Sequence, residues 1–258
     1  MNRKRTLISD AFKVKKRRLA ENTFDKASCG EADPGGPLDI KSSLEYLMTL
    51  FPRKVFNDSL PRIAMKHQLY SLHSAKTLVD RQLNLLREQG EVVIFQLGFD
   101  ADAFGLVFTS DYKEKTLAGI AGTECQDTVE KFMNKVLPSC TDLSFNKEKM
   151  LKEFLFTDSE ITQLVKCGVL TVRDAGSWWL SVPNAGKFTK YFIQGRKAVL
   201  NMVKKAKYGE VLKNELELRR TTSHVKFPMK YHIYDIMGAE LVESIPTTSG
   251  TMLRYVDT

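Results

Sequence analysis

Asp102, Ala103, Phe104 and Gly105 spell D-A-F-G, a near match to the D-F-G metal ligand of protein kinases. A kinase also needs a Gly-rich loop over the phosphates, a strand lysine paired to a helix glutamate, and an H-R-D catalytic loop. None of these is present, and D-A-F-G falls between two predicted strands with no catalytic loop before it. We therefore expect no phosphotransfer, no catalytic residue and no enzymatic activity.

No other catalytic or metal-binding motif stands out in the sequence. There is no G-x-S-x-G elbow and no H-E-x-x-H helix, and a pair such as Asp58 with His67 arises in any chain by chance. The cysteines are far apart, form no C-x-x-C pair and lie near no histidine: Cys29, Cys125, Cys140 and Cys167. We therefore expect no zinc site, no cofactor and no disulfide framework, and unpaired thiols fit a reducing compartment.

Positive charge is confined to two segments of this 258-residue chain, whose formal net charge is +8. Residues 1–20 carry eight basic residues against one acidic residue, and residues 184–220 carry ten against three. Residues 21–183, by contrast, carry 18 basic and 23 acidic residues. Such segregation indicates a surface that binds a polyanion, because an ordinary solvated surface mixes the two signs.

The first 37 residues read as a disordered basic tail that ends in the breaker cluster Pro34 to Pro37. Its basic cluster is of the nuclear-import kind, and consists of Lys13, Lys15, Lys16, Arg17 and Arg18. The alternatives are a solvating arm and a nonspecific contact to nucleic acid. No apolar run approaches a membrane span, and the N-terminus lacks a signal core. We expect a soluble protein of the nucleus with no membrane partner.

Beyond the tail, the apolar spacing repeats in three similar blocks of three helices and a β-hairpin. The helices are predicted at 40–51, 59–72 and 76–89, at 127–137, 147–156 and 157–166, and at 187–206, 208–220 and 229–237. The hairpin strands are predicted at 91–97 and 106–110, at 169–172 and 178–182, and at 239–246 and 251–256. The third helix of each block is predicted to end at a glycine: Gly90, Gly168 and Gly238.

Three helices and a hairpin make a winged helix, so the predicted fold is mainly α with small hairpins, α+β, in three tandem winged-helix domains. We place them at 38–112, 113–183 and 184–258, each small enough that neighbours must pack together. Thr157 or Asp158 is expected to cap a helix. Adjacent Trp178 and Trp179 must point to opposite faces of their strand, one into the core and the other onto a neighbouring domain or a partner.

The predicted DNA-binding residues lie in the third block. At 100° per residue, lysines fall on one side of its first helix, namely Lys187, Lys190, Lys197, Lys204 and Lys205. Apolar residues fall on the other side: Phe188, Phe192, Val199, Met202 and Val203. Lys207, Arg219 and Arg220 extend the charge. We expect Lys190, Lys204 and Arg219 to carry most of the affinity for the DNA backbone, with the others in support. A merely solvated face is the alternative, and Gly195 could break the helix.

The third helices of the first two blocks are less suited to DNA. They contain or begin with acids such as Asp80, Glu88, Asp158 and Glu160, which repel phosphate. Direct base reading by these blocks is therefore disfavoured. Protein docking is the natural role for them, and a pure interaction scaffold without nucleic-acid function is the alternative for the whole chain.

Four stretches of the chain resemble the vertebrate family called serine/threonine-protein kinase nineteen, in its short form. They are VFNDSLPRIAMKHQLYSL, DRQLNLLREQGEVVIFQLGFDADAFG, DSEITQLVKCGVLTVRDAGSWWLSVPNAGKF and TTSGTMLR, and the similarity runs from about Ser43 to Thr258. Despite the kinase name, the resemblance implies a nuclear DNA-binding protein of three winged helices that acts in transcription-coupled nucleotide excision repair.

The resemblance also implies partners. It implies a bridge between double-stranded DNA and the repair assembly at a stalled RNA polymerase II. That assembly includes the Cockayne syndrome A protein, the UV-stimulated scaffold protein and the repair helicase of the general transcription factor. Binding to RNA and formation of a homodimer stay open.

Overall fold

The structure is a computed structural model that describes residues 39–98, 103–139 and 142–256. Residues Leu38–Thr258 form one compact unit. The predicted tail and its import cluster lie outside the described residues. The domain boundaries at 113 and 184 stay predictions, because the compact unit is not subdivided further.

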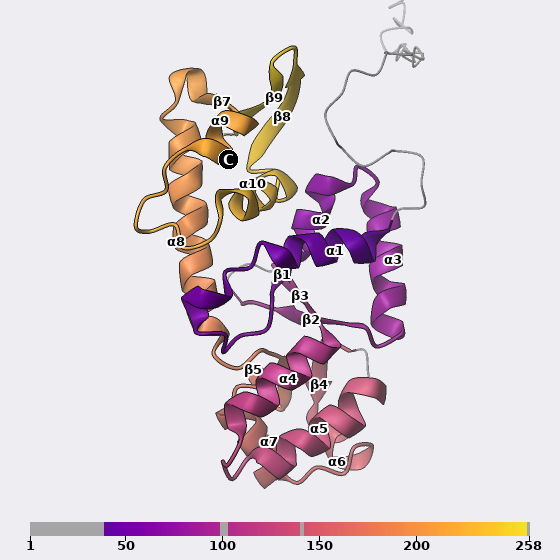
Figure 1. Cartoon of the computed structure of the whole chain (residues 1–258). Coiled ribbons are helices and arrows are strands. Elements are labelled where there is room, and N and C mark those ends of the chain that lie inside the picture. Colours follow the sequence, from indigo (N-terminus) through magenta and orange to yellow (C-terminus); the bar gives the residue numbers. More distant parts are fainter. Residues whose placement is uncertain (1–38, 99–102, 140–141, 257–258) are drawn as a thin grey trace, which may run out of the picture. The chain divides into compact units, whose positions relative to one another are not determined.

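The described residues repeat one order of elements three times: helix, short strand, helix, helix, strand, strand (Figure 1). The first set is α1 (Ile40–Thr49), β1 (Ala64–Met65), α2 (Lys66–Leu72), α3 (Lys76–Glu88), β2 (Val92–Gln96) and β3 (Phe104–Phe108), with a 3-10 turn, η1 (Arg53–Phe56), after α1. This is the element order of a winged helix. The predicted fold class, α+β with small antiparallel sheets, is confirmed.

The second set follows a helix that the sequence analysis missed, α4 (Thr109–Ile120). It comprises α5 (Gln126–Ser139), β4 (Ser144–Asn146), α6 (Lys147–Lys152), α7 (Asp158–Lys166), β5 (Leu170–Asp174) and β6 (Ser177–Leu180). Thr157 is the cap of α7: its hydroxyl accepts from the backbone N–H of Glu160, whose carboxylate accepts in turn from the N–H of Thr157 at 2.7 Å. This reciprocal pair fixes where the helix begins.

The third set comprises α8 (Ala185–Lys204), β7 (Glu210–Leu212), α9 (Lys213–Leu218), α10 (Met229–Gly238), β8 (Val242–Thr247) and β9 (Gly250–Tyr255), with a 3-10 turn, η2 (Lys207–Gly209), before β7. The helices predicted over 59–72 and 208–220 are each wrong in part. The first half of 59–72 is a loop and β1, and the first half of 208–220 is η2 and β7. Strands of two or three residues are too short to display an alternating pattern, which is why β1, β4 and β7 were all missed.

The three sheets are antiparallel and share one strand order, with the last strand of each set in the middle. The pairings Ile94 with Leu106, Thr171 with Trp179, and Ser244 with Leu253 set the hairpin registers. In β6 the half-buried Trp178 packs against the core, as expected for one of the two tryptophans. The ring of Trp179 instead lies under the guanidinium of Arg173, 4.4 Å from its centroid.

The expectation for the helix-ending glycines is confirmed at two positions and wrong at the third. Gly90 and Gly168 follow their helices with φ of 73° and 74°, a left-handed conformation that glycine adopts without strain. Gly238 lies inside α10, and Glu240 takes the left-handed position instead, with φ of 56°. Gly238 is needed for a different reason: a β-carbon there would stand 1.8 Å from the carbonyl oxygen of His67.

One hydrophobic core runs through all three sets of elements. It contains Phe51 and Phe56 of the first set, Phe132 of the second, and Phe188 and Phe227 of the third. The ring of Phe188 stacks on that of Phe51 with centroids 6.1 Å apart, and meets Phe227 edge-on at 5.5 Å. Because these aromatic contacts join distant parts of the sequence, the sets stabilise one another.

Candidate nucleic-acid interface

Helix α8 has an apolar side that holds it in the molecule. Phe188, Phe192, Val199 and Val203 are fully buried, as the spacing predicted, and Met202 is half-buried. Helix α10 lies between α8 and α2 (Figure 1). The apolar side therefore fixes which side of α8 faces solvent.

Gly195 does not break α8, contrary to the expectation that it could. The helix runs without interruption from Ala185 to Lys204. A β-carbon at 195 would stand 2.1 Å from Nε2 of His232 on α10, so only glycine admits the imidazole here. His232 is fully buried, and burial lowers its pKa to about 4, so the ring is neutral at pH 7.

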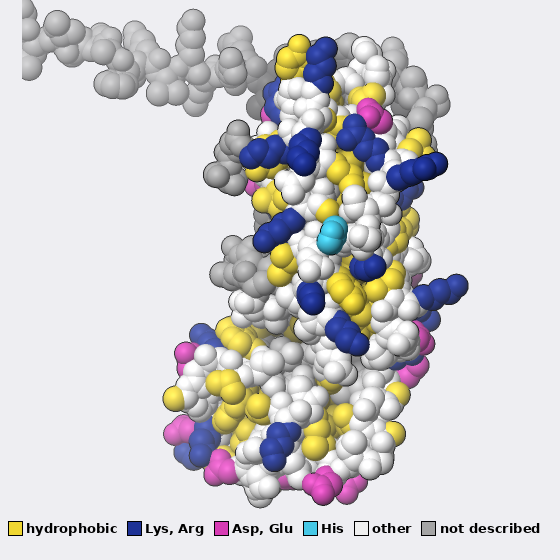
Figure 2. Space-filling view, turned by 90° about the vertical axis from the view of Figure 1, so that its left-hand side faces the viewer, with side chains coloured by type: hydrophobic (Ala, Val, Ile, Leu, Met, Phe, Trp, Pro, Cys, Tyr) yellow, Lys and Arg dark blue, Asp and Glu magenta, His cyan; other side chains and the backbone are white. Residues whose placement is uncertain are grey.

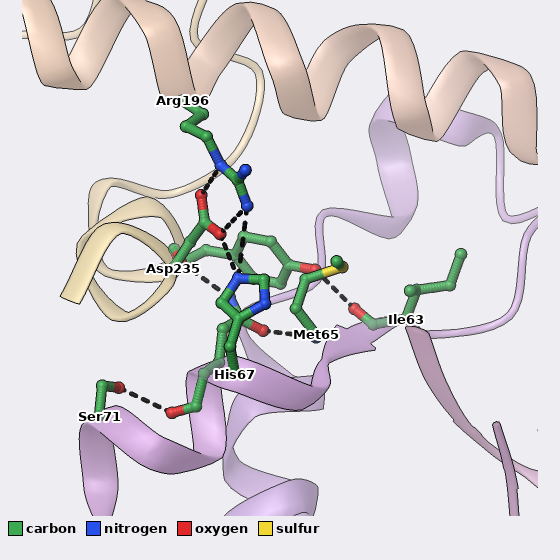
Figure 3. Close-up of polar contacts among 8 residues, drawn as sticks. Ile63, Met65, His67, Ser71, Arg196 and Asp235 are labelled. Atoms are coloured by element: carbon green, nitrogen blue, oxygen red, sulfur yellow. Dashed lines mark hydrogen bonds and ion pairs between the residues drawn. The ribbon is translucent and has the colours of Figure 1, made fainter. Parts of the chain in front are cut away.

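A buried ion pair also joins α8 to its neighbours (Figure 3). The Arg196 guanidinium donates from Nε to Oδ2 of Asp235 at 2.8 Å and from its terminal nitrogen to Oδ1 at 2.6 Å. His67 of α2 meets the same Oδ1 at 2.5 Å. Burial acts to raise the pKa of Asp235, but the hydrogen bonds from His67 and Arg196 outweigh it and lower the pKa. This network ties α2, α8 and α10 together.

The other side of α8 is a row of exposed lysines. The five lysines predicted on this side of the helix are all exposed: Lys187, Lys190, Lys197, Lys204 and Lys205. Two basic residues that follow the helix, Lys207 and Arg220, are exposed as well. At about 1.5 Å per residue, the row from Lys187 to Lys204 is roughly 26 Å long. Viewed from the α8 side, Figure 2 shows Lys and Arg side chains spread over the upper face with few acids among them, while acids gather lower down. We call these seven residues the basic face.

Acids are absent from α8 and are paired in the segment that follows it in the chain. Residues 184–209 contain no Asp or Glu at all. The acids that follow are each paired: Glu210 with Arg254 at 2.7 Å, Glu215 with Arg219 at 2.6 Å, and Glu217 with Lys230 at 3.6 Å. Lys187, Lys190 and Lys197 form no ion pair within the described part of the chain. Their charge is therefore available to an external anion.

Two of the three residues expected to dominate DNA binding have contacts within the protein. Arg219 is half-buried, pairs with Glu215 and donates to the carbonyl oxygen of Met202 at 3.4 Å. The ammonium of Lys204 lies 4.8 Å from the ring centroid of Tyr255. Lys190, by contrast, is exposed and forms no ion pair within the described part of the chain. The structure thus favours the N-terminal lysines of α8 over Arg219 as the primary contacts.

Sequence reasoning missed three basic residues beside α8. Arg53 and Lys54 lie on η1, whose Phe56 packs against Tyr191 of α8 with ring centroids 6.0 Å apart. Lys226 precedes Phe227, whose ring meets Phe188 of α8. All three are exposed. Aromatic packing between distant segments brings them close to α8, and no local sequence pattern signals this.

Two of the third helices, α10 and α7, are poor DNA readers, each for its own reason. In α10 only Lys230 is exposed, so this helix cannot enter a groove. In α7 the carboxylate of Glu160 pairs with Lys131 at 2.7 Å beside the exposed Asp158. Acids at this helix start repel phosphate. The first helix of the third set is therefore better placed for DNA than α7 or α10.

The described residues offer little for other chemistry. No cluster of three or more His, Cys, Asp or Glu in them could hold a metal ion. No helix in the same residues has the length and apolar character to cross a membrane. His67 bonds to Asp235, and Asp58 pairs with Lys115, so this pair from the sequence is not a site.

Cys125 and Cys167 are distant in sequence but adjacent in space, which the spacing did not reveal. Both are half-buried free thiols. Burial and the neighbouring thiol of Cys125 raise the pKa of Cys167 to about 12. A thiol with so high a pKa is a weak nucleophile at pH 7.

Comparison with known proteins places this chain in a family. The family described as "Inactive serine-threonine protein kinase 19" matches residues 40–255. The human protein named winged helix repair factor 1 is 51% identical over 254 residues, spanning 98% of this chain and 97% of its own. The proteins of the same name from mouse and Xenopus laevis are 50% and 45% identical, each over 100% of both chains. The chain belongs to the family described as inactive serine-threonine protein kinase 19.

Proposed function

We propose that this chain is a DNA repair factor that binds double-stranded DNA through the basic face, without preference for base sequence and without enzymatic activity. The names of the vertebrate relatives support the repair role. One observation carries the DNA-binding proposal: the lysines of α8 stand in a row whose neighbouring acids are absent or already paired. Lysines without base-edge partners contact phosphates, which are the same in every sequence.

The family description and the sequence both argue against phosphotransfer. The matching family is described as inactive. The parts of a kinase site other than D-A-F-G are missing from the sequence, and Phe104 and Gly105 of that motif belong to β3. We therefore propose a binding protein rather than an enzyme, and the repair-factor names of the relatives support a location in the nucleus.

The bridging role and its partners are part of the same proposal. The resemblance implies that the protein joins DNA to the stalled RNA polymerase II repair assembly in transcription-coupled nucleotide excision repair. The acidic excess of residues 21–183 supports this division of labour, because those residues are less suited to DNA and leave their surfaces for proteins.

Charge reversal with a matched control tests the DNA-binding proposal. Lys187, Lys190 and Lys197 are changed together to Glu. The control changes three exposed lysines of the second set to Glu: Lys135, Lys152 and Lys166. Affinity is measured by fluorescence anisotropy on two duplexes of unrelated sequence.

The reversal in α8 is expected to weaken binding to both duplexes by roughly a hundredfold, at about 1 kcal/mol for each charge. The control variant, which has the same change in net charge, is expected to lose far less affinity for either duplex. Negligible DNA affinity of the wild type would instead support the pure protein-interaction scaffold.

A further inference from the structure

Tyr208 is a surface residue that the fold itself does not explain. It lies in η2, directly after α8, and its side chain is 83% exposed. Its backbone is left-handed, with φ of 59° and ψ of 15°. Among the described residues, its ring is contacted by the ammonium of Lys207, 5.2 Å from the ring centroid.

The left-handed backbone makes tyrosine an unfavourable choice at this position. A residue with a β-carbon loses roughly a five- to thirtyfold factor in the folding equilibrium when it adopts this conformation. Among the other left-handed positions of the described residues, Asn57, Asp58 and Asn184 carry side chains that tolerate this conformation, whereas Leu155 and Glu240, like Tyr208, do not. Glycine adopts the left-handed conformation without strain, as the adjacent Gly209 does with φ of 67°. Glycine would therefore fit position 208 better than tyrosine.

The surroundings of Tyr208 are cationic. It follows Lys204, Lys205 and Lys207 of the basic face. The nearest acid along the chain, Glu210, is paired with Arg254. Leu218, which is 87% exposed, lies next to Arg219, and Arg219 in turn bonds to the carbonyl of Met202 on α8. Exposed apolar side chains thus adjoin the C-terminal end of the lysine row.

We propose that Tyr208 stacks on an unpaired base, so that the basic face binds DNA containing unpaired bases more tightly than fully paired DNA. Lysines on the phosphates combined with an exposed aromatic ring form the usual platform for unstacked bases. Stacking accepts any base, which fits a face without base-edge readers. This inference rests on the proposed DNA-binding function. A protein partner would also use an exposed tyrosine, but the three lysines beside it favour a polyanion.

The test compares Tyr208→Gly with Tyr208→Phe, which keeps the ring. The control is Leu155→Gly, because Leu155 is also left-handed, with φ of 56°, and 66% exposed, but lies away from the basic face after α6. Affinity is measured for a duplex of about 20 base pairs, longer than the lysine row, and for the same duplex with a central unpaired bubble. A fluorescent adenine analogue in the bubble reports stacking by quenching.

Tyr208→Gly is expected to lose about tenfold in affinity for the bubble, to lose the quenching, and to keep its duplex affinity. Tyr208→Phe and Leu155→Gly are expected to behave as wild type on both probes. Both glycine variants are expected to fold at least as stably as wild type, because strain is relieved.

An unchanged ratio of bubble to duplex affinity in a folded Tyr208→Gly variant would overturn the inference. Failure of the wild type to bind either probe would instead overturn the proposed function, so the two failures are distinguishable.

Discussion

Gly195 of α8 lies so close to His232 of α10 that a β-carbon at position 195 would stand 2.1 Å from Nε2 of the imidazole. The two helices meet at this point, and Arg196 bonds to Asp235 one position further along α8. The orientation of the basic face therefore depends on a contact that only glycine permits.

Gly195→Ala is expected to destabilise the protein by about 1–3 kcal/mol, because the added methyl group overpacks the contact with His232. Alanine alone would favour the helix by about 1 kcal/mol, so helix propensity predicts the opposite sign. Gly186→Ala in the same helix is the control, since nothing lies within 4 Å of its added β-carbon. Urea unfolding of both variants measures the difference, and equal or greater stability of Gly195→Ala would contradict the packing account.

The stability of the protein is expected to fall as the pH drops from 6.5 towards 4. Burial lowers the pKa of His232 from 6.5 to about 4, so in this range the unfolded chain binds a proton that the folded chain excludes. The loss amounts to about 3 kcal/mol over the full range. His232→Phe removes the titration, so its free energy of unfolding should vary less with pH. The same pH slope in wild type and variant would assign the effect to another group.

The tail prediction concerns residues outside the described part of the chain. Replacing Lys15, Lys16, Arg17 and Arg18 with Ala is expected to reduce nuclear accumulation and to leave the thermal midpoint unchanged, because the sequence predicts that this basic arm makes no core contacts. Fluorescence microscopy of tagged chains measures the accumulation. Unchanged import would reassign the cluster to solvation or to nucleic-acid contact.

The purified protein is expected neither to bind ATP with magnesium nor to transfer phosphate, since the residues that position them are missing. Calorimetric titration with ATP and a radiolabel transfer assay provide the measurements. Phosphotransfer that survives purification and is abolished by a point mutation that leaves the chain folded would refute this.

The sequence predicted the parts of the fold that depend on local pattern. The 3.6-residue period placed α8 and its two sides, and a capping pattern placed the start of α7 at Thr157 or Asp158. Contacts between distant segments were not predictable in this way. The roles of Gly195 and Gly238 depend on His232 and His67, which lie 37 and 171 positions away in the sequence.

The candidate site was predictable to a similar extent. The exposure of Lys187, Lys190 and Lys197 followed from the helical period. The partial engagement of Arg219 did not, because its hydrogen bond to the carbonyl of Met202 depends on how α9 packs on α8. Arg53 also escaped prediction, since the packing of Phe56 against Tyr191 brings η1 beside α8.

The central claim is that phosphates of double-stranded DNA bind the lysines of α8. The salt dependence of duplex affinity tests this most directly, because each phosphate contact contributes about 0.9 to the slope of log affinity against log salt. Changing Lys187, Lys190 and Lys197 to Glu removes three contacts and is expected to flatten the slope by about 2.7, while the control reversal of Lys135, Lys152 and Lys166 leaves it nearly unchanged. Equal slopes for the wild type and a well-folded α8 variant would contradict the account.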